Sequence, residues 1–199
     1  NMLSVLSSSF TILFLFWSIT HLAKRLSGEQ DPQGGTLVAV LGSGVVGALA
    51  YTFSDSFWFS AVEGEVYALS SLFTALVFWA ILKWENVADR PDSTKWIILI
   101  AYLMGLSIGV HLLNLLAIPA IAMVYYFRNY DFSWKGLAIT GAVSIALLGF
   151  VQEALIKGAV QLAGSFELFF VNDLGMGFNT GALVYLALLV ALIVGLLMV

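Results

Sequence analysis

The stretch that decides how this chain is built is "WIILIAYLMGLSIGVHLLNLLAIPAIAMVYYF", residues 96–127. Apolar runs of about 17–25 residues are typical of membrane-spanning helices, and this run is longer than one span requires. Gly105 and Gly109 near its middle permit a bend in the backbone. We therefore predict two antiparallel spans, residues 96–110 and 112–127, joined by a turn within "GLSIGVHLLN".

The two predicted spans are short, which sets the depth of the turn between them. About 15 helical residues cover about 23 Å, less than the roughly 30 Å of a hydrocarbon core. The turn should therefore lie below the outer surface, with His111 and Asn114 at membrane depth. An ionisable residue there is costly and favours a functional role, although a buried neutral His bonded to a backbone carbonyl is an equal alternative.

Composition extends this prediction to the whole chain, which has 199 residues, 61% of them hydrophobic and 10% charged, with a mean hydropathy of +0.99. A soluble domain is about one quarter charged. We predict an all-α, polytopic transmembrane bundle of about seven spans. The absence of a basic footprint excludes nucleic acid as a partner, and the absence of cysteine excludes thiol chemistry. The other five predicted spans cover residues 3–22, 36–53, 65–82, 137–155 (extending to 160) and 182 onward.

Both ends of the sequence indicate a piece of a longer protein. Asn1 leads almost directly into a span, and the chain stops within "LLVALIVGLLMV" without polar flanking residues. We expect residues 1–199 to form one transmembrane domain that is truncated at both ends.

Lys and Arg residues predict the orientation, because cytoplasmic loops carry an excess of both. If the loops after the first, third and fifth spans are cytoplasmic, seven of the eight basic residues lie inside. The outer side then holds residues 54–64, the His111 turn and a long loop at 153–181, with Lys157 as its one basic residue. The seven inner basic residues are Lys24, Arg25, Lys83, Arg90, Lys95, Arg128 and Lys135.

Acidic residues gather in "SDSFWFSAVEGEVYALSSLF", residues 54–73, which carries Asp55, Glu63 and Glu65 and no Lys or Arg. On a continuous helix, Glu63 and Glu65 would face opposite ways, about 200° apart. A non-helical entry at Gly64 would let them converge, and such a pair can bind a divalent cation, position a substrate or share a proton. The alternative is that the acids face water and favour the helix dipole.

Two further motifs have simpler interpretations. The aromatic "FWF" of residues 57–59 is typical of an interfacial belt, or of a short amphipathic helix on the outer surface, with contact to lipid tails as the alternative. The sequence "GSGVVG" at 42–47 matches the dinucleotide fingerprint but lies inside an apolar span, without the strand that a fingerprint needs. Small residues four apart there favour close helix packing instead.

His21 ends the first predicted span and is interpreted as a marker of the cytoplasmic interface.

Three motifs in order, "SDSFWFSAVEGEVYALSSLF", "GLSIGVHLLNLLAIPA" and "FFVNDLGMGFNTG", resemble a family. It consists of bacterial multi-pass membrane proteins, once filed as a domain of unknown function, that are similar to protein O-mannosyltransferases of the GT-C glycosyltransferase superfamily. The resemblance implies transfer of a sugar from a polyprenyl-phosphate donor to a protein or glycan acceptor, with mannose as the preferred sugar. It implies a bacterial inner-membrane location with the active side facing the periplasm, in contact with membrane lipid.

The resemblance also implies roles for individual residues. The family's first acidic loop would precede Leu3, so this fragment is expected to lack it and to be inactive alone. Glu63 and Glu65 occupy the loop that matches a second acidic motif, which helps bind metal in related enzymes. The resemblance does not imply that the enzyme depends on a metal, and it leaves open whether a divalent metal is a cofactor. The candidate catalytic residues are Glu63, Glu65 and His111, the candidate metal ligands are Glu63 and Glu65, and the candidate substrate-binding residues are Asp55, Asn114 and Asn172.

Two other functions stay open from the residues alone. An ion- or proton-coupled transporter segment would use Glu63, Glu65 and His111 as its path. A non-catalytic membrane scaffold would use none of them. A transporter would gain support from acids in mid-span or from two similar halves, and the sequence has neither feature.

Overall fold

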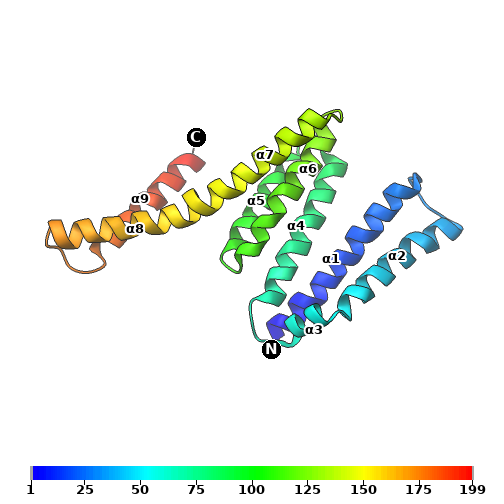
Figure 1. Ribbon diagram of the computed structural model, residues 1–199, viewed down its shortest axis with the longest axis horizontal. Helices are drawn as coiled ribbons and strands as arrows, with labels where there is room; N and C mark the ends of the chain where they lie inside the picture. The colour runs from blue at the N-terminus through cyan, green and yellow to red at the C-terminus, as the bar shows by residue number, and fades with distance from the viewer. Residues whose placement is uncertain (1, 199) are drawn as a thin grey trace. The chain divides into compact units, whose positions relative to one another are not determined.

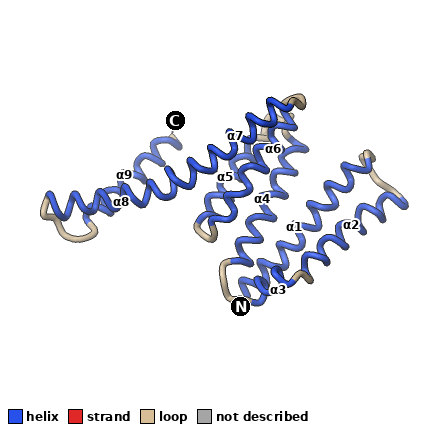
Figure 2. The backbone as a smooth tube through the Cα atoms, viewed as in Figure 1, coloured by secondary structure: helices blue, strands red, loops and turns tan. Residues whose placement is uncertain are grey.

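The computed structural model describes residues 2–198, and they form helices and connecting turns without a strand (Figures 1 and 2). Six helices of this part of the chain are long and apolar enough to cross a membrane. The predicted all-α, polytopic class is therefore confirmed, and the chain is a multi-pass membrane protein. The chain divides into two compact units, one ending at Ser144 and the other starting at Ile145.

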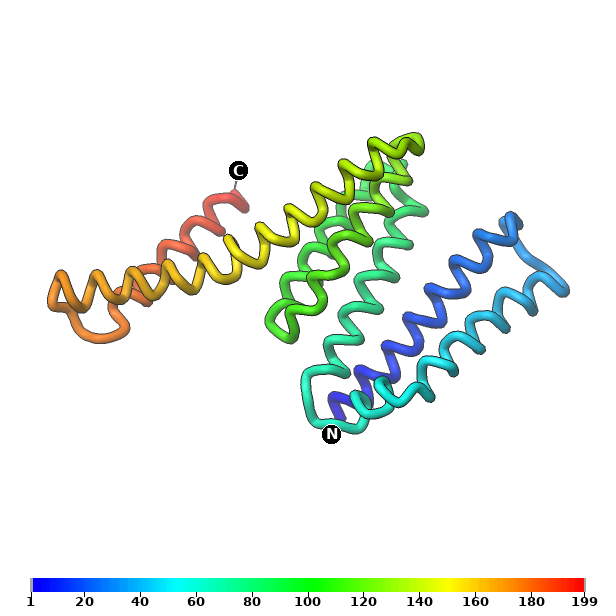
Figure 3. Tube along the Cα trace, in the orientation of Figure 1, coloured from blue at the N-terminus to red at the C-terminus, as the bar shows by residue number. Residues whose placement is uncertain are grey.

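The first unit is arranged around one central helix, α4, which packs against α1 on one side and against α5 and α6 on the other (Figure 3). Helix α2 packs against α1, and the short α3 packs against the start of α1 and α4. The elements of this unit are α1 (Met2–Ser27), α2 (Gly34–Thr52), α3 (Asp55–Val62), α4 (Tyr67–Val87), α5 (Thr94–Ile108), the 3₁₀ helix η1 (Leu112–Leu116), α6 (Ala117–Asn129) and the beginning of α7 (Trp134–Phe150).

The predicted division of residues 96–127 is confirmed. Helix α5 ends at Ile108, the chain turns through His111, and η1 leads into α6. Helix α5 has 15 residues and is shorter than the six candidate spans, as the sequence indicated. The turn lies at the same end of the unit as α3, because α4 and α5 run in opposite directions.

The hydrophobic core lies on one face of α4. Val77, Ala80, Ile81 and Trp84 are all at least 96% buried, and Ile100 of α5 completes the cluster. Their spacing along α4 (three, four and seven residues from the first) places them on one helical stripe. This stripe explains why α4 stands at the centre of the unit.

Small residues join α1 to its neighbours. The buried positions of α1 are all Ser or Thr, while many of its large apolar side chains are exposed. Lipid is as apolar as leucine, so helices in membranes associate through small residues that allow close approach rather than by hiding large ones. The buried hydroxyls of Thr11 and Ser18 donate to carbonyls of their own helix, at 2.7 and 2.8 Å. The buried residues are Ser4, Ser7, Ser8, Thr11 and Ser18.

The glycine motif of α2 is a packing surface, as predicted. A methyl group on Gly44 would lie 2.8 Å from the ring of Phe16 in α1, and one on Gly47 would lie 2.5 Å from Cδ1 of Ile19. Gly44 and Ala48 are both buried. The motif therefore sets the distance between α1 and α2.

We predict that Gly44→Leu destabilises the first unit by about 1–3 kcal/mol, because extra volume in a closely packed contact forces side chains and backbone apart. Gly42→Leu is the matched control, since nothing lies within 4 Å of a methyl group at that position. Thermal unfolding of the full-length protein in detergent would measure both. Equal stability of the two variants would contradict the assigned α1–α2 contact.

Ionic contacts fix the end of the first unit where α4 finishes, which we call the basic end. Arg25 of α1 forms an ion pair with Glu85 of α4. Arg128 of α6 forms an ion pair with Asp89, and its Nε donates to the carbonyl of Glu85 at 3.3 Å. Helices α1 and α6 are thus attached to the last turn of α4 and to the residues just after it. We call the opposite end, with α3, residues 63–66 and the His111 turn, the acidic end.

The second unit differs from the expectation. The sequence predicted a span ending near residue 155 and an outer loop at 153–181, but the chain is helical from Trp134 to Asp173. Between Trp134 and Leu197, only residues 174–179 are non-helical. The region has no proline, and its first glycine with positive φ is Gly175 (φ 66°), so nothing ends the helix earlier. Beyond α7 come a π-helical segment (Val151–Lys157), α8 (Gly158–Leu168), a second π-helical segment (Phe169–Asp173) and α9 (Thr180–Leu197).

Glu167 joins α8 to the start of α9. Its Oε1 accepts the backbone N–H of Asn179 at 2.5 Å, and its Oε2 accepts the N–H of Ala182 at 3.0 Å. The first N–H groups of a helix have no partner within the helix, so a carboxylate there satisfies them. Gly181 allows the two helices to approach each other. Glu167 is therefore an internal helix cap, although the sequence placed it among the acids of an outer loop.

Candidate functional site

The acidic end brings together most of the residues that the sequence singled out. Asp55 begins α3, where a carboxylate favours the helix dipole. Together with Phe53, Trp58 and Phe59, it lines an open cavity of about 330 Å³. The rings of Phe53 and Trp58 are stacked, with centroids 6.2 Å apart. A short helix is present at this position, and these three aromatic side chains are exposed on it or beside it.

Glu63 and Glu65 lie in the non-helical segment between α3 and α4. Glu63 ends α3 with extended backbone (φ −70°, ψ 146°), and α4 begins only at Tyr67. The backbone between the two glutamates is therefore non-helical, which is the condition under which their carboxylates can converge. The carbonyl of Glu63 accepts a hydrogen bond from Ser4 Oγ at 2.9 Å, which holds the segment against the start of α1.

His111 contacts the residue that follows this segment. Its ring centroid is 5.6 Å from that of Tyr67, the first residue of α4 and two positions after Glu65. Its Nδ1 accepts the N–H of Leu113 at 3.1 Å, so it caps η1. Because Nδ1 is the acceptor, the neutral ring carries its proton on Nε2, which is left to donate to another group.

Asn114 is inside the protein rather than in an open site. It is 3% exposed, and its Oδ1 accepts hydrogen bonds from the hydroxyls of Thr74 and Ser70 of α4, the second at 3.4 Å. Its Nδ2 is buried and has no partner within residues 2–198. Sequence reasoning did not identify Ser70 and Thr74, although hydroxyls four residues apart share one face of a helix. Asn114 thus joins the His111 turn to α4.

Asn172 belongs to the second unit. It lies in the π-helical segment Phe169–Asp173 and is exposed. Its substrate-binding role remains a prediction.

A metal ion would have few protein ligands at the acidic end. Within the described part of the chain, no three or more His, Asp or Glu side chains are grouped so that they could hold one. Calcium takes six to eight oxygen ligands, whereas magnesium is usually held by one or two carboxylates together with waters and substrate phosphates. Glu63 and Glu65 provide two carboxylates from one short segment, and their role as metal ligands remains a prediction.

The fold and these residues define a class: a multi-pass α-helical membrane protein with an acidic and aromatic site at one end of its helices. The family model described as "Protein O-mannosyl-transferase TMEM260 N-terminal domain" matches residues 1–134, more than half of the chain. The chain therefore belongs to this family. The matched residues include every candidate site residue except Asn172.

One curated relative is similar over part of its length. The chain is 25% identical over 123 residues to a protein of Dictyostelium discoideum named "Protein O-mannosyl-transferase tmem260". The match covers 57% of this chain and 15% of the relative, so the chain spans only a small part of that protein's length. No solved structure matches the chain.

Proposed function

We propose that the full-length protein is a GT-C-type glycosyltransferase. It would move a sugar from a polyprenyl-phosphate donor to a protein or glycan acceptor, with mannose as the preferred sugar. The family match and the relative's name support sugar transfer to protein. The observation that carries the proposal is the ring contact between His111 and Tyr67, which directly follows the non-helical segment that holds Glu63 and Glu65.

The carboxylates supply the base. As the bond between the sugar's C1 and the donor phosphate breaks, the acceptor hydroxyl forms a new bond to C1 and loses its proton. A carboxylate positioned at the hydroxyl accepts that proton in general-base catalysis. Glu63 and Glu65 are both exposed on a segment without helical constraints, so either one can reach an acceptor.

His111 acts on the leaving group. A phosphate leaving group gains negative charge as the bond breaks, and hydrogen-bond donors aimed at that charge lower the barrier. The Nε2 proton of His111 is such a donor, because Nδ1 is already engaged by Leu113. Asn114 holds the turn that carries His111, and its role is positioning.

The α3 helix receives the lipid-linked donor. Phe53, Trp58 and Phe59 are exposed aromatic side chains of the kind found at membrane interfaces. They can contact the first isoprene units, while Asp55 in the same cavity accepts hydrogen bonds from sugar hydroxyls. Asn172 is retained as a further substrate contact on the basis of the sequence motif.

The acidic end faces outward in this proposal. Residues 54–66 contain no Lys or Arg, whereas Lys and Arg gather at the basic end. The positive-inside rule then assigns the basic end to the cytoplasm. In a bacterial inner membrane, the acidic end would face the periplasm.

Purified full-length protein should transfer labelled mannose from polyprenyl-phosphate mannose to an acceptor peptide, and should not use a nucleotide-linked mannose. Transfer from the nucleotide sugar alone would contradict the proposed donor. Absence of transfer together with cation or proton flux in proteoliposomes would replace the proposal with a transport function for Glu63, Glu65 and His111.

A further inference from the structure

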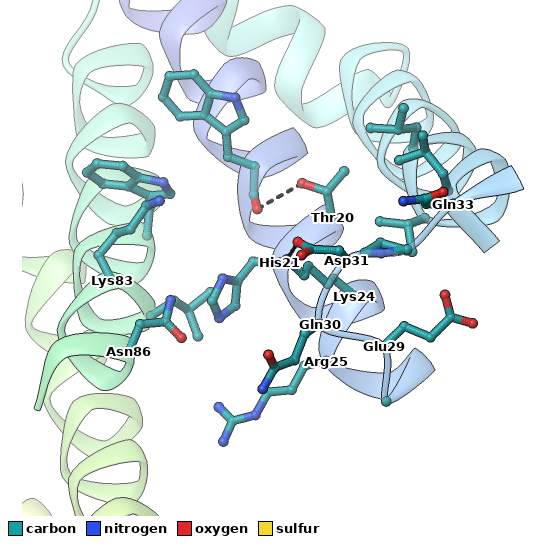
Figure 4. A pocket seen from close by; sticks show the side chains of 18 residues that line it. Thr20, His21, Lys24, Arg25, Glu29, Gln30, Asp31, Gln33, Lys83 and Asn86 are labelled. Atoms are coloured by element: carbon teal, nitrogen blue, oxygen red, sulfur yellow. Dashed lines mark hydrogen bonds and ion pairs between the residues drawn. The ribbon is translucent and has the colours of Figure 1, made fainter. Parts of the chain in front are cut away.

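A cavity of about 1050 Å³ lies at the basic end, away from the proposed site (Figure 4). Its walls come from α1, from the loop joining α1 to α2, from α2 and from α4, all within the first unit. Figure 4 shows Lys83 and Asn86 extending from α4 on one side and His21, Lys24 and Arg25 from α1 on the other. The proposed glycosyl transfer uses none of these residues.

Two ammonium groups at the rim are available to a ligand. Lys83 forms no ion pair with any residue in the described range, and its Nζ lies 5.5 Å from the centroid of the Trp79 ring. Lys24 lies 3.9 Å from Asp31, whose side chain is 95% exposed. An exposed ion pair at this distance contributes little to the free energy of folding. Arg25, in contrast, is engaged by Glu85 and serves the contact between α1 and α4.

The wall also holds a polar atom in need of a partner. His21 lines the cavity, and its Nε2 is buried without a hydrogen-bond partner in residues 2–198. Buried polar atoms normally have a partner, and an unsatisfied one costs about 1–3 kcal/mol. Because Nε2 is closed to solvent, a ligand oxygen bonds to it once the His21 ring turns toward the cavity, and that bond removes the cost.

The wall of the cavity on the membrane side is apolar and aromatic. Trp17 of α1 and Trp79 of α4 lie with ring centroids 5.9 Å apart, and Leu37 and Leu41 of α2 contribute to the same wall. Tryptophan is enriched where membrane helices meet the headgroup region. The cavity therefore combines a cationic rim with an aromatic and apolar wall, at the end where we expect these helices to leave the membrane.

The acids on the rim restrict the charge of the ligand. Glu29 and Asp31 also line the cavity, and Glu29 accepts a hydrogen bond from Thr36 at 3.0 Å. The ammonium groups of Lys83 and of Lys24, which is only weakly paired with Asp31, suit one negative charge better than the several charges of a polyphosphate. A phosphodiester, with its single charge, fits this balance.

We propose that this cavity binds the headgroup of an anionic membrane phospholipid, with phosphatidylglycerol as the representative ligand. Lys24 and Lys83 contact the phosphodiester, His21 bonds to a headgroup oxygen, and the acyl chains leave along Trp17 and Trp79. Basic residues near a membrane surface attract anionic lipids, and a shaped cavity adds selectivity among headgroups. This proposal is independent of the reaction at the acidic end.

The test uses full-length protein in detergent and counts retained phosphatidylglycerol by native mass spectrometry. The double variant Lys24→Gln/Lys83→Gln should bind this lipid about 30-fold more weakly, since each Lys near a lipid surface contributes about 1 kcal/mol and about 1.4 kcal/mol is a factor of ten. The control Lys95→Gln/Lys135→Gln removes the same charge outside the cavity and should bind normally. In wild type, a photoreactive phosphatidylglycerol should crosslink to residues of α1, α2 and α4 at the cavity, a result that does not depend on how the variants fold.

Several outcomes would overturn the proposal. They are equal retention of phosphatidylcholine and phosphatidylglycerol by wild type, equal losses in the two double variants, undiminished binding by Lys24→Gln/Lys83→Gln, and crosslinking elsewhere. Inorganic phosphate supplies the remaining arm of the test. If it displaces the lipid at equal concentration, the cavity is a site for free phosphate and not for a lipid.

Discussion

Replacing Glu63 and Glu65 together by Gln is expected to lower sugar transfer by the full-length protein about 10²–10⁴-fold, the usual contribution of a general base. Glutamine keeps the size and the hydrogen-bonding carbonyl of the side chain but cannot accept the acceptor's proton at neutral pH. The contact that Ser4 makes here is to the backbone carbonyl of Glu63, which the substitution leaves in place. The measurement is transfer from polyprenyl-phosphate mannose at saturating donor and acceptor.

The single variants separate the two roles. If one carboxylate is the base, its Gln variant should lose kcat, while the other should change mainly KM. Asp92→Asn is the matched control, because Asp92 is exposed, lies at the basic end and pairs only weakly with Lys95. Full activity of the double variant would exclude this segment from catalysis, even if the protein proves to be a mannosyltransferase.

Gly181→Val is expected to cost the second unit about 3 kcal/mol or more, at the upper end of the range for overpacked contacts. A methyl group on Gly181 would lie 2.5 Å from Cα and 2.6 Å from the backbone N of Glu167, and would also meet the carbonyl of Phe166. These are backbone atoms of α8, which cannot rotate away as a side chain can. Moving α9 outward would also break the two hydrogen bonds that Glu167 makes to its first turn.

Gly177→Val provides the comparison, since Gly177 lies in the loop that leads into α9 and nothing is within 4 Å of a methyl group there. Limited proteolysis and thermal unfolding in detergent would report on both variants. Cleavage in residues 174–179 should increase only for Gly181→Val. If both variants behave like wild type, α8 and α9 do not approach each other as closely as described.

Local patterns predicted most of the first unit. The glycines near His111 and the flanking charges of Lys95 and Arg128 were enough to divide residues 96–127 correctly, because the bend and the two loop ends are encoded within the stretch itself. The small-residue motif at 42–47 was interpreted correctly for the same reason. The sixth span was too short in the prediction because charged and polar residues after Leu155 suggested a loop. A helix tolerates such residues when no proline or left-handed glycine interrupts it.

The site was less accessible to sequence reasoning, since it depends on contacts between distant residues. The pattern placed His111 and the Glu63–Glu65 segment on one side of the membrane, but only the fold brings His111 against Tyr67. The sequence predicted that Asn114 contacts the substrate. Its hydrogen-bond partners Ser70 and Thr74 could not be predicted, because they lie 44 and 40 residues away in the sequence. The cavity at the basic end was missed altogether, because His21 and Lys83 become neighbours only when α1 and α4 pack.

The two ends of α4 also differ in how readily each can open. At the C-terminal end, guanidinium groups from α1 and α6 attach to the last turns of the helix. At the other end, four residues of irregular backbone lead into α4. This segment is held to α1 by the hydrogen bond that the Ser4 hydroxyl donates to the carbonyl of Glu63. Free energies of local opening are lowest in exposed, irregular segments. Thermal fluctuations should therefore concentrate at Glu63–Val66, giving the acidic segment room to adjust around a ligand while the opposite end of the same helix stays fixed.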